Sequence, residues 1–348
     1  MDAKYLYSKA QKILFMNRSN DTATVPIRIG IVVPCFNEED VIRETNDRLI
    51  MLINQLQSNG LISHESSIIY IDDGSRDATW SIIEALSQSH PTVSGIKLSR
   101  NQGHQNALLC GLMTSPGDAL ISVDADLQDD LNVIPQMIHH FLKGNEIVYG
   151  VRKSRETDTY FKRFTAEGYY KLMSIMKVDI IFNHADYRLL SRRAINALSE
   201  YREINLFLRG LVRLLGFKSE VVEYDRAERF AGESKYPLRK MLSFAWQGIT
   251  SFSTAPLRLI TFLGITVSIV SIALAAWGFL STLFTDSTLP GWASTVIPMY
   301  FLGGVQLFSL GIIGEYISKI YMENKSRPRF HVDQKIGTSF SKNKKNHE

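Results

Sequence analysis

The chain has 348 residues, a net charge of +4 and 21% charged residues. This length exceeds one typical domain and allows a full-sized core, and the moderate charge excludes general disorder. The mild basic excess does not indicate a nucleic-acid-binding protein, and the two cysteines, Cys35 and Cys110, do not form a disulfide framework. Residues 1–26 are polar and lack the apolar core of a signal peptide, so we expect a cytosolic N-terminal extension.

A unit of strand, polar turn and helix is repeated along the first part of the chain. Apolar runs predict strands at residues 27–33, 68–71, 95–98, 119–123 and 147–151. Apolar residues at helical spacing follow the first three turns, at residues 40–56, at residues 80–86 and in a segment through Gly111. This alternation predicts an α/β domain with a mostly parallel sheet and helices on both faces. Residues 189–198 form a further amphipathic segment.

Carboxylates are concentrated at the ends of the predicted strands. The second strand ends in Asp-Asp-Gly-Ser at residues 72–75, and the fourth in Asp-Ala-Asp-Leu-Gln at residues 124–128. Open α/β sheets bind their ligands at the carboxyl ends of strands. Neither a Gly-x-Gly-x-x-Gly fingerprint after the first strand nor a Gly-Lys-Ser/Thr loop occurs, which argues against a dinucleotide fold and P-loop chemistry.

The Asp-Ala-Asp-Leu-Gln turn predicts a metal site. It supplies hard oxygen ligands at alternating positions, which suits Mg²⁺ or Mn²⁺. Such an ion usually keeps some waters and completes its shell with substrate phosphates. Taken alone, the turn could also be an acidic cap of the next helix.

Two basic segments follow. Arg152 begins the first, after the fifth predicted strand, and Arg229 and Lys235 lie in the second, a glycine-containing loop. Beside a metal and a diphosphate, these cations could bind phosphate. Without such a site, the first segment would be the solvated end of a helix.

The composition then becomes apolar. Residues 259–285 and 287–314 contain no charged residue, and each exceeds the ~20 residues that span a bilayer, so we expect a two-helix transmembrane hairpin at residues 258–317. Lys and Arg flank the pair on both sides, which predicts both flanks in the cytosol. Residues 237–257 form an amphipathic segment that could lie in the membrane interface or in a core. Residues 318–348 are expected to be a basic cytosolic tail, disordered after His331.

Four ordered motifs resemble one enzyme family. Residues 33–39 (Val-Pro-Cys-Phe-Asn-Glu-Glu), 72–75, 124–128 and 229–235 (Arg-Phe-Ala-Gly-Glu-Ser-Lys) are similar to the motifs of inverting GT-A glycosyltransferases of family 2. The similarity is greatest to the polyprenyl-phosphate branch, with its dolichol-phosphate mannose synthase-like enzymes and bacterial bactoprenol glucosyltransferases. It implies a cytosolic GT-A nucleotide-sugar-binding domain at residues 27–236, followed by the two transmembrane helices.

The resemblance also implies roles for individual residues. The nucleotide-binding residues would be Pro34, Phe36, Glu38, Ile71, Asp73, Asp124 and Ala125. The metal ligands would be Asp126 and Gln128, with Asp124 beside them, and the cations for phosphate and acceptor would be Arg152, Arg229 and Lys235. Asp186 and Asp124 would be the catalytic carboxylates. The chain departs from the family at residues 183–186, Asn-His-Ala-Asp in place of Thr-Gly-Asp, and at His104, where lysine is common.

The implied reaction is metal-dependent inverting transfer from a nucleotide sugar, with UDP as the expected nucleotide, to undecaprenyl or another polyprenyl phosphate. A phosphate monoester has a second pKa near ~6, so the acceptor is largely doubly ionised at neutral pH. A strong general base is therefore less necessary than for a hydroxyl acceptor. We hypothesise that Asp186 mainly orients the acceptor or the basic side chains, with a role as base as the alternative.

Three other functions fit the sequence less well. A processive polysaccharide synthase would normally carry Gln-x-x-Arg-Trp, which is absent. A catalytically silent scaffold would be expected to lose the metal-site residues, which are present. A transport protein would use the two spans themselves, but the apolar stretches contain no charged residue, which argues against an ion path. The expected location is the cell membrane, with both termini in the cytosol, and relatives suggest self-association through the membrane segment.

Overall fold

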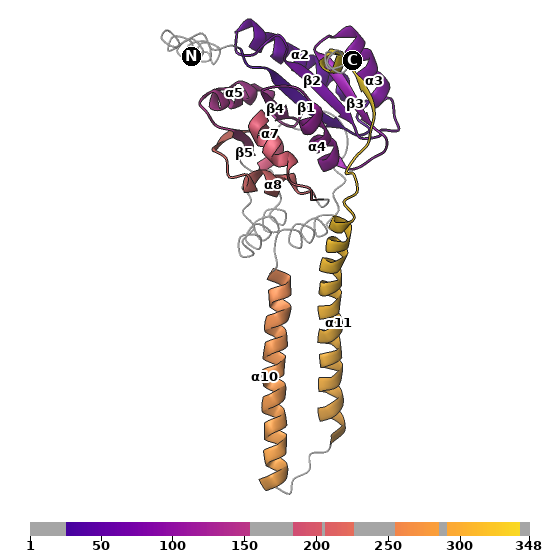
Figure 1. The fold of residues 1–348 in the computed structure, drawn as a ribbon, viewed down its shortest axis with the longest axis vertical. Helices are drawn as coiled ribbons and strands as arrows, with labels where there is room; N and C mark the ends of the chain where they lie inside the picture. Colours follow the sequence, from indigo (N-terminus) through magenta and orange to yellow (C-terminus); the bar gives the residue numbers. More distant parts are fainter. Residues whose placement is uncertain (1–25, 154–183, 204–205, 226–254, 285–290, 342–348) are drawn as a thin grey trace.

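The computed structural model of the protein describes residues 26–153, 184–203, 206–225, 255–284 and 291–341. An α/β domain lies at one end, and two long helices extend away from it side by side (Figure 1). The predicted N-terminal extension, Arg229, Lys235 and most of the amphipathic segment at 237–257 lie outside the described residues.

The domain is built on one sheet, which has eight strands in the described part of the chain, in the order β7-β5-β6-β4-β1-β2-β3-β8. The strands are β1 (Ile29–Cys35), β2 (Ser67–Asp72), β3 (Val93–Leu98), β4 (Ala119–Ser122), β5 (Ile147–Arg152), β6 (His184–Ser191), β7 (Ser219–Tyr224) and β8 (Val332–Ile336). Only β6 and β8 run antiparallel to their neighbours among these strands. The prediction of an α/β fold with a mostly parallel sheet is confirmed.

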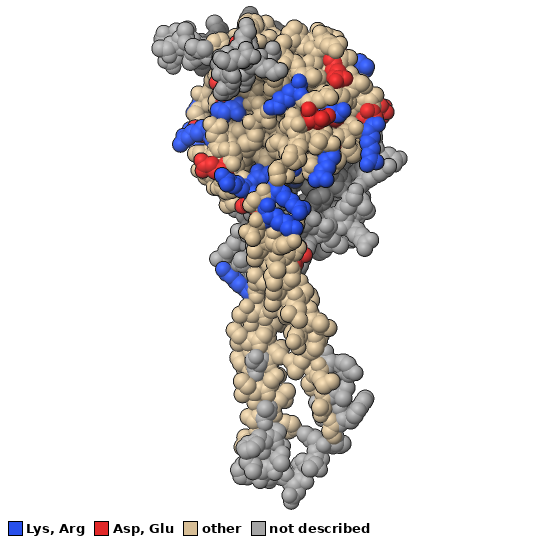
Figure 2. Space-filling model, turned by 45° about the vertical axis from the view of Figure 1, so that its right-hand side comes forward, with Lys and Arg blue, Asp and Glu red and all other residues tan. Residues whose placement is uncertain are grey.

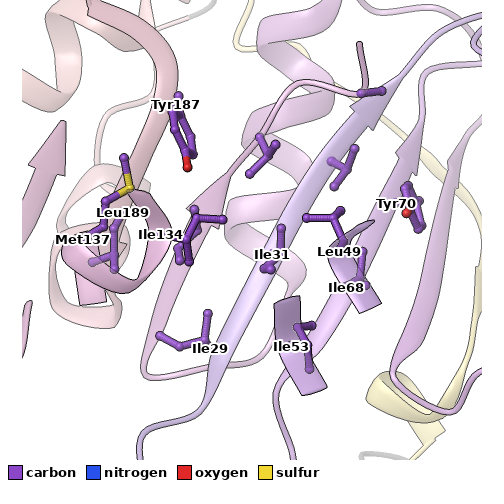
Figure 3. Close-up of a cluster of buried hydrophobic side chains, with 14 of the residues drawn as sticks. Ile29, Ile31, Leu49, Ile53, Ile68, Tyr70, Ile134, Met137, Tyr187 and Leu189 are labelled. Carbon is purple, nitrogen blue, oxygen red and sulfur yellow. The ribbon is translucent and has the colours of Figure 1, made fainter. Parts of the chain in front are cut away.

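Helices cover both faces of this sheet. The described helices of the domain are α2 (Ile42–Ser58), α3 (Thr79–Ser89), α4 (His104–Thr114), η1 (Leu131–Val133), α5 (Ile134–Leu142), α7 (Arg192–Ser199), α8 (Leu208–Leu214) and α12 (Thr338–Ser341). Along β1, Ile29, Ile31 and Val33 enter one core and Val32 enters the other, because successive side chains of a strand face opposite sides. Figure 3 shows the first core, where Leu49 and Ile53 of α2 lie over the strands.

Strand β6 was not predicted. We expected an amphipathic segment at residues 189–198, but β6 ends at Ser191 and α7 begins at Arg192. The side chain of Ser191 accepts a hydrogen bond from the Ala194 backbone N–H, and this cap separates the two elements. Leu189 and Leu190 enter opposite cores, which is the two-residue period of a strand buried on both faces. The strand inserts between β4 and β5.

The expectation of a disordered tail after His331 was wrong for residues 332–341, and residues 342–348 lie outside the described residues. Strand β8 pairs with β3, and Ile336 packs against the first core, while Phe330, Val332 and Phe340 pack against the second. These four apolar side chains bury enough surface to order a segment that reads as polar and lysine-rich on average. The chain therefore returns to the sheet after the two long helices.

The long helices are α10 (Ala255–Phe284) and α11 (Gly291–Asn324). Both are long and apolar enough to cross a membrane, by length and composition. Little of their most apolar segments is buried, 0% in α10 and 6% in α11. On the face drawn in Figure 2, their described part shows almost no charge, whereas Lys and Arg gather where they meet the domain.

Helix α11 joins the domain at the carboxyl edge of the parallel strands. It ends at Asn324, and the chain enters β8 at Val332, which pairs with Leu98 at the end of β3. The Ser99 N–H donates to the carbonyl of His331 at 3.0 Å. The edge at which β1, β2 and β4 end is therefore the edge beside the apolar helices.

Candidate functional site

The turn after β4 is held in a fixed shape. Leu127 has φ +57°, in the left-handed region that a branched side chain rarely adopts. This backbone allows the Gln128 N–H to donate to Asp126 Oδ1 at 3.2 Å. From α2, Thr45 Oγ1 donates to the carbonyl of Ala125 at 2.7 Å. Asp126 is thus presented on a braced turn at the carboxyl edge, as the Asp-x-Asp-x-Gln pattern predicts.

The loops after β1 and β2 are fastened to each other. Asn37, at φ +55°, accepts at Oδ1 from the Arg76 N–H at 2.9 Å, and its own N–H donates to Ser75 Oγ at 3.0 Å. The Ala78 N–H donates to Glu39 Oε2 at 2.8 Å. Phe36 stands beside these contacts with 41% of its surface exposed. An exposed aromatic ring on a rigid loop can stack on a ligand's base.

Asp73 braces the next loop. Its two carboxylate oxygens accept from the Gln102 and Gly103 N–H groups at 2.7 and 2.9 Å, and the residue is only 2% exposed. Burial raises the pKa of Asp73, and the two hydrogen bonds oppose this increase. Gly103 has φ +88°, which glycine adopts without the strain of a side chain. Together these features fix the position of His104, the first residue of α4.

The structure brings Asp124 and Asp186 together. Strands β4 and β6 pair antiparallel with Ser122 opposite Arg188, and continuing this register by two residues sets Asp186 opposite Asp124. His104 Nε2 lies 3.6 Å from Asp124 Oδ1 and 3.8 Å from Asp186 Oδ2. Two carboxylates from adjacent strands therefore share one imidazole.

Asp186 is the centre of a buried ion cluster. It is 6% exposed, and it pairs with Arg188, which is 1% exposed, and with Arg209. Gln105 Nε2 also donates to Asp186 Oδ2 at 3.1 Å. Burial alone would raise the pKa of Asp186, but Arg209 and Arg188 outweigh it and hold this pKa well below its usual range. The carboxylate stays ionised and is a poor acceptor for a proton.

A second cluster adjoins the turn at residues 124–128. Tyr224 donates to Asp129, and Arg152 approaches both, with Nε 3.2 Å from the Tyr224 hydroxyl and Nη2 3.5 Å from Asp129 Oδ1. The Arg152 side chain is 27% exposed, whereas that of Asp129 is 1% exposed. Arg152 is thus tied to the carboxylate three residues beyond Asp126 and keeps an accessible surface.

The residues of the turn fit a divalent cation. Partial burial of Asp124, whose side chain is 34% exposed, raises its pKa to about 6. His104 opposes the rise, and the charges of Asp129, Asp186 and Asp126 add to it. A bound cation would reduce the electrostatic repulsion between these closely spaced carboxylates. Within the described ranges, no three His, Cys, Asp or Glu side chains form a ready metal cage. A bound ion would use Asp124, Asp126 and Gln128 and take further oxygens from phosphate or water.

The predicted residues differ in how far they reach the surface at this edge. Phe36, Glu38, Asp124 and Asp126 reach it, and Arg152 is partly exposed. The side chain of Ile71 is fully buried in the second core. The other predicted residues that the structure describes are also buried: Pro34, Asp73, Ala125, Gln128 and Asp186. Arg229 and Lys235 lie outside the described residues.

Sequence reasoning gave no role to Gln105, Arg188 or Arg209, which the structure places around Asp186. One signal was available: Arg209 stands alone among apolar residues at positions 206–212. A lone cation in an apolar helix needs either a buried partner or a ligand.

Comparison with known proteins identifies this architecture. Residues 30–199 match the family model described as glycosyl transferase family 2. The uncharacterized glycosyltransferase YkoT of Bacillus subtilis (strain 168) is 51% identical over 307 residues, covering 88% of this chain and 91% of that protein. The bactoprenol glucosyl transferase of Shigella phage SfX is 42% identical over 307 residues, covering 88% of this chain and 99% of that protein.

Solved structures are more distant. The mannosyltransferase PcManGT from Pyrobaculum calidifontis, in complex with GDP-Man and Mn²⁺, has a TM-score of 0.43 and 13% sequence identity. The similarity covers 90% of this chain and 94% of that one.

Proposed function

The chain belongs to glycosyl transferase family 2 and is a glycosyltransferase, and from this premise we propose that it transfers a sugar from a nucleotide sugar, with UDP as the nucleotide, to a polyprenyl phosphate. The reaction inverts the anomeric centre and uses Mg²⁺ or Mn²⁺. The product, a sugar on an undecaprenyl-type phosphate, would serve modification of a cell-envelope glycan.

One observation carries the proposal: the acidic carboxyl edge lies beside the apolar helices. Helix α11 enters the domain next to Leu98, at the edge that carries Asp124 and Asp126. A soluble nucleotide sugar and a phosphate on a membrane lipid could meet only at such a boundary. The name of the phage relative, a bactoprenol glucosyl transferase, agrees with a polyprenyl acceptor.

The residues would divide the work as follows. The loops after β1 and β2, with Pro34, Phe36, Glu38 and Asp73, would hold the nucleoside. A divalent cation on Asp124, Asp126 and Gln128 would act as a Lewis acid on the leaving diphosphate. Arg152, Arg229 and Lys235 would bind the phosphates of donor or acceptor. These are the residues that face the edge or that the family resemblance assigns to it.

The displacement needs little proton chemistry. An oxygen of the acceptor phosphate attacks C1 of the sugar, the new C1–O bond forms, and the bond from C1 to the diphosphate breaks with its electron pair. A phosphate monoester is largely a dianion above its second pKa of ~6, so no proton must be removed. The pKa of Asp186 is held low by Arg209 and Arg188, which suits a group that orients cations rather than a base.

We further propose that α10 and α11 span the membrane. Lys and Arg at the junction with the domain, visible in Figure 2, would then lie at the anionic cytosolic surface. Both flanks of the helix pair would be cytosolic, and the enzyme would meet its lipid by diffusion in two dimensions. The apolar faces of the helices are largely exposed, which leaves room for lipid or for another copy of the chain.

A transfer assay tests the proposal. Purified enzyme in detergent receives undecaprenyl phosphate, Mg²⁺ or Mn²⁺, and a panel of radiolabelled UDP-sugars, beside Asp126→Ala and the exposed control Asp333→Ala. We expect label in the lipid fraction with one sugar, loss of at least about 100-fold in Asp126→Ala, and no change in the control. Donor hydrolysis without labelled lipid would point to another acceptor and to a processive enzyme. No turnover of any nucleotide sugar would refute the proposal.

A further inference from the structure

The start of helix α8 is held at the site by the backbone N–H and the backbone carbonyl of Leu208. Its N–H donates to Gln105 Oε1 at 3.0 Å, and its carbonyl accepts from Arg188 Nη1 at 3.3 Å. Gln105 and Arg188 each also contact Asp186. The position of α8 is therefore set by the partners of Asp186, and the next residue along the helix is Arg209.

Arg209 forms a fork on Asp186. Its Nε lies 3.3 Å from Oδ1 and its Nη2 3.2 Å from Oδ2, the side-on arrangement in which a planar guanidinium holds a carboxylate. The Arg209 side chain is 40% exposed, against 6% for Asp186 and 1% for Arg188. Arg209 is thus the member of the cluster that a ligand can reach.

The two guanidinium groups of this cluster differ in access. Arg188 pairs with Asp186 and is sealed from solvent, whereas Arg209 pairs with the same carboxylate and keeps part of its surface exposed. Arg209 is therefore the cation of the cluster that an incoming molecule can meet. A partly desolvated cation whose orientation is fixed by a buried carboxylate is a binding group for an anion.

The order of the strands selects which anion. The loops fastened around Asn37 and Ser75 follow β1 and β2, on one side of β4, whereas Asp186 lies on β6, on the other side. The Asp126 turn lies between them, at the end of β4. An inverting displacement requires the nucleophile to approach C1 from the side opposite the leaving group. An anion on Arg209 is therefore on the side of the acceptor.

We propose that Arg209 binds the phosphate monoester of the acceptor lipid, and that Asp186 is the positioning residue that fixes its guanidinium. This inference rests on the proposed function, because it assigns a contact to the acceptor of that reaction. It gives Asp186 a task that needs no proton transfer, and it gives Gln105 the task of aligning Asp186 with α8.

Steady-state kinetics with two varied substrates test this assignment. The variants are Arg209→Gln, Arg209→Lys and, as a matched control on the same helix, the exposed Arg213→Gln. Polyprenyl phosphate is varied at saturating nucleotide sugar, and the nucleotide sugar is varied at saturating lipid. For Arg209→Gln we expect the acceptor KM to rise about 10- to 100-fold, the loss typical of a hydrogen-bonded charge, with the donor KM within about 2-fold of wild type. Arg209→Lys keeps the charge without the fork, so its acceptor KM should rise less.

The outcomes separate the two proposals. Wild-type enzyme that transfers no sugar to the lipid refutes the proposed function and this inference with it. Wild-type transfer with an unchanged acceptor KM in Arg209→Gln refutes the Arg209 contact alone, and so does a rise confined to the donor KM. If Arg209→Gln does not fold, Arg209→Lys decides by the same ratio of acceptor KM to donor KM. If Arg209 had a purely structural role, its variants would have a lower kcat or a lower yield of folded protein, without a selective rise of the acceptor KM over the donor KM.

Discussion

Replacing Asp186 with asparagine isolates the charge at the centre of the site. The substitution keeps the size of the side chain and removes the negative charge that Arg188 and Arg209 share. Asparagine has one acceptor oxygen, and its amide group would face the Gln105 amide, which now donates to Asp186 Oδ2. Arg188 would keep its charge with no counter-charge within the cluster.

The expected cost follows from the burial of Arg188. Its side chain is 1% exposed, so water cannot replace the lost carboxylate. Removing one partner of a buried ion pair costs about 3–5 kcal/mol of unfolding free energy. A domain of this size loses about 2–4 °C of melting temperature per kcal/mol, which predicts a decrease of about 6–20 °C.

The chain carries its own reporter for this measurement. Cys35 and Cys110 are its only two cysteines, and both are free and buried in the α/β domain. Burial raises the pKa of Cys110 to about 11 and that of Cys35 well above its usual value, so neither thiol reacts while the domain is folded. Fluorescence of a thiol-reactive dye during heating in detergent therefore reports unfolding of this domain and not of the apolar helices.

Two comparisons sharpen the result. Asp333→Asn, an exposed carboxylate on β8, should melt within about 1–2 °C of wild type, because exposed substitutions usually change stability by less than ~0.5 kcal/mol. Adding Arg188→Met to Asp186→Asn should recover part of the loss, since it removes the uncompensated charge. A melting temperature of Asp186→Asn equal to that of Asp333→Asn would refute the buried ion cluster.

Two further predictions concern the sheet edge and the turn at residues 124–128. Ile336→Ala removes a partly buried side chain of β8 from the first core and should lower the unfolding free energy by about 1–2 kcal/mol in urea titration. The exposed control Gln334→Ala should leave the unfolding free energy unchanged. Equal urea midpoints for the two variants would show that Ile336 adds no packing energy. The pKa of Asp124 is raised to about 6 in the folded state, against ~3.9 for an aspartate in the unfolded chain. The folded state therefore binds this proton more tightly, and the contribution of Asp124 to stability without metal is lost as the pH rises from about 4 through 6. When the unfolding free energy is measured in chelator between pH 4 and 8, Asp124→Asn should lack this part of the decrease. Parallel curves of unfolding free energy against pH for the wild type and the variant would contradict the raised pKa.

The first half of the domain could be predicted because its signals are local. The strands β1, β2 and β4 are fully buried, and β3 is buried except at Lys97. Each is short and ends in a polar turn, so the sequence itself shows which residues lie at the carboxyl edge. The Asp-x-Asp-x-Gln turn is specified by adjacent residues in the same way. The parallel order of these strands then follows from the connecting helices.

The remainder depends on distant partners. Strand β8 is recognisable only against β3, more than two hundred residues earlier in the chain. Composition alone made the same segment look disordered, because its few apolar side chains are separated by polar residues. The ion cluster around Asp186 draws Gln105 from 81 residues away and Arg209 from 23 residues away. No local period relates these positions, so the sequence could suggest a role for Asp186 without the cations that define it.

The mass of the lipid product tests the central claim most directly. Purified enzyme would be incubated with undecaprenyl phosphate and the active nucleotide sugar, and the lipid would be extracted and weighed by mass spectrometry beside a reaction given undecaprenol. The account predicts that the phosphate lipid gains the mass of one sugar residue, with one nucleoside diphosphate released per product, and that the alcohol gains nothing. A sugar on the alcohol, or release of nucleoside diphosphate with no change in the mass of the lipid, would contradict it.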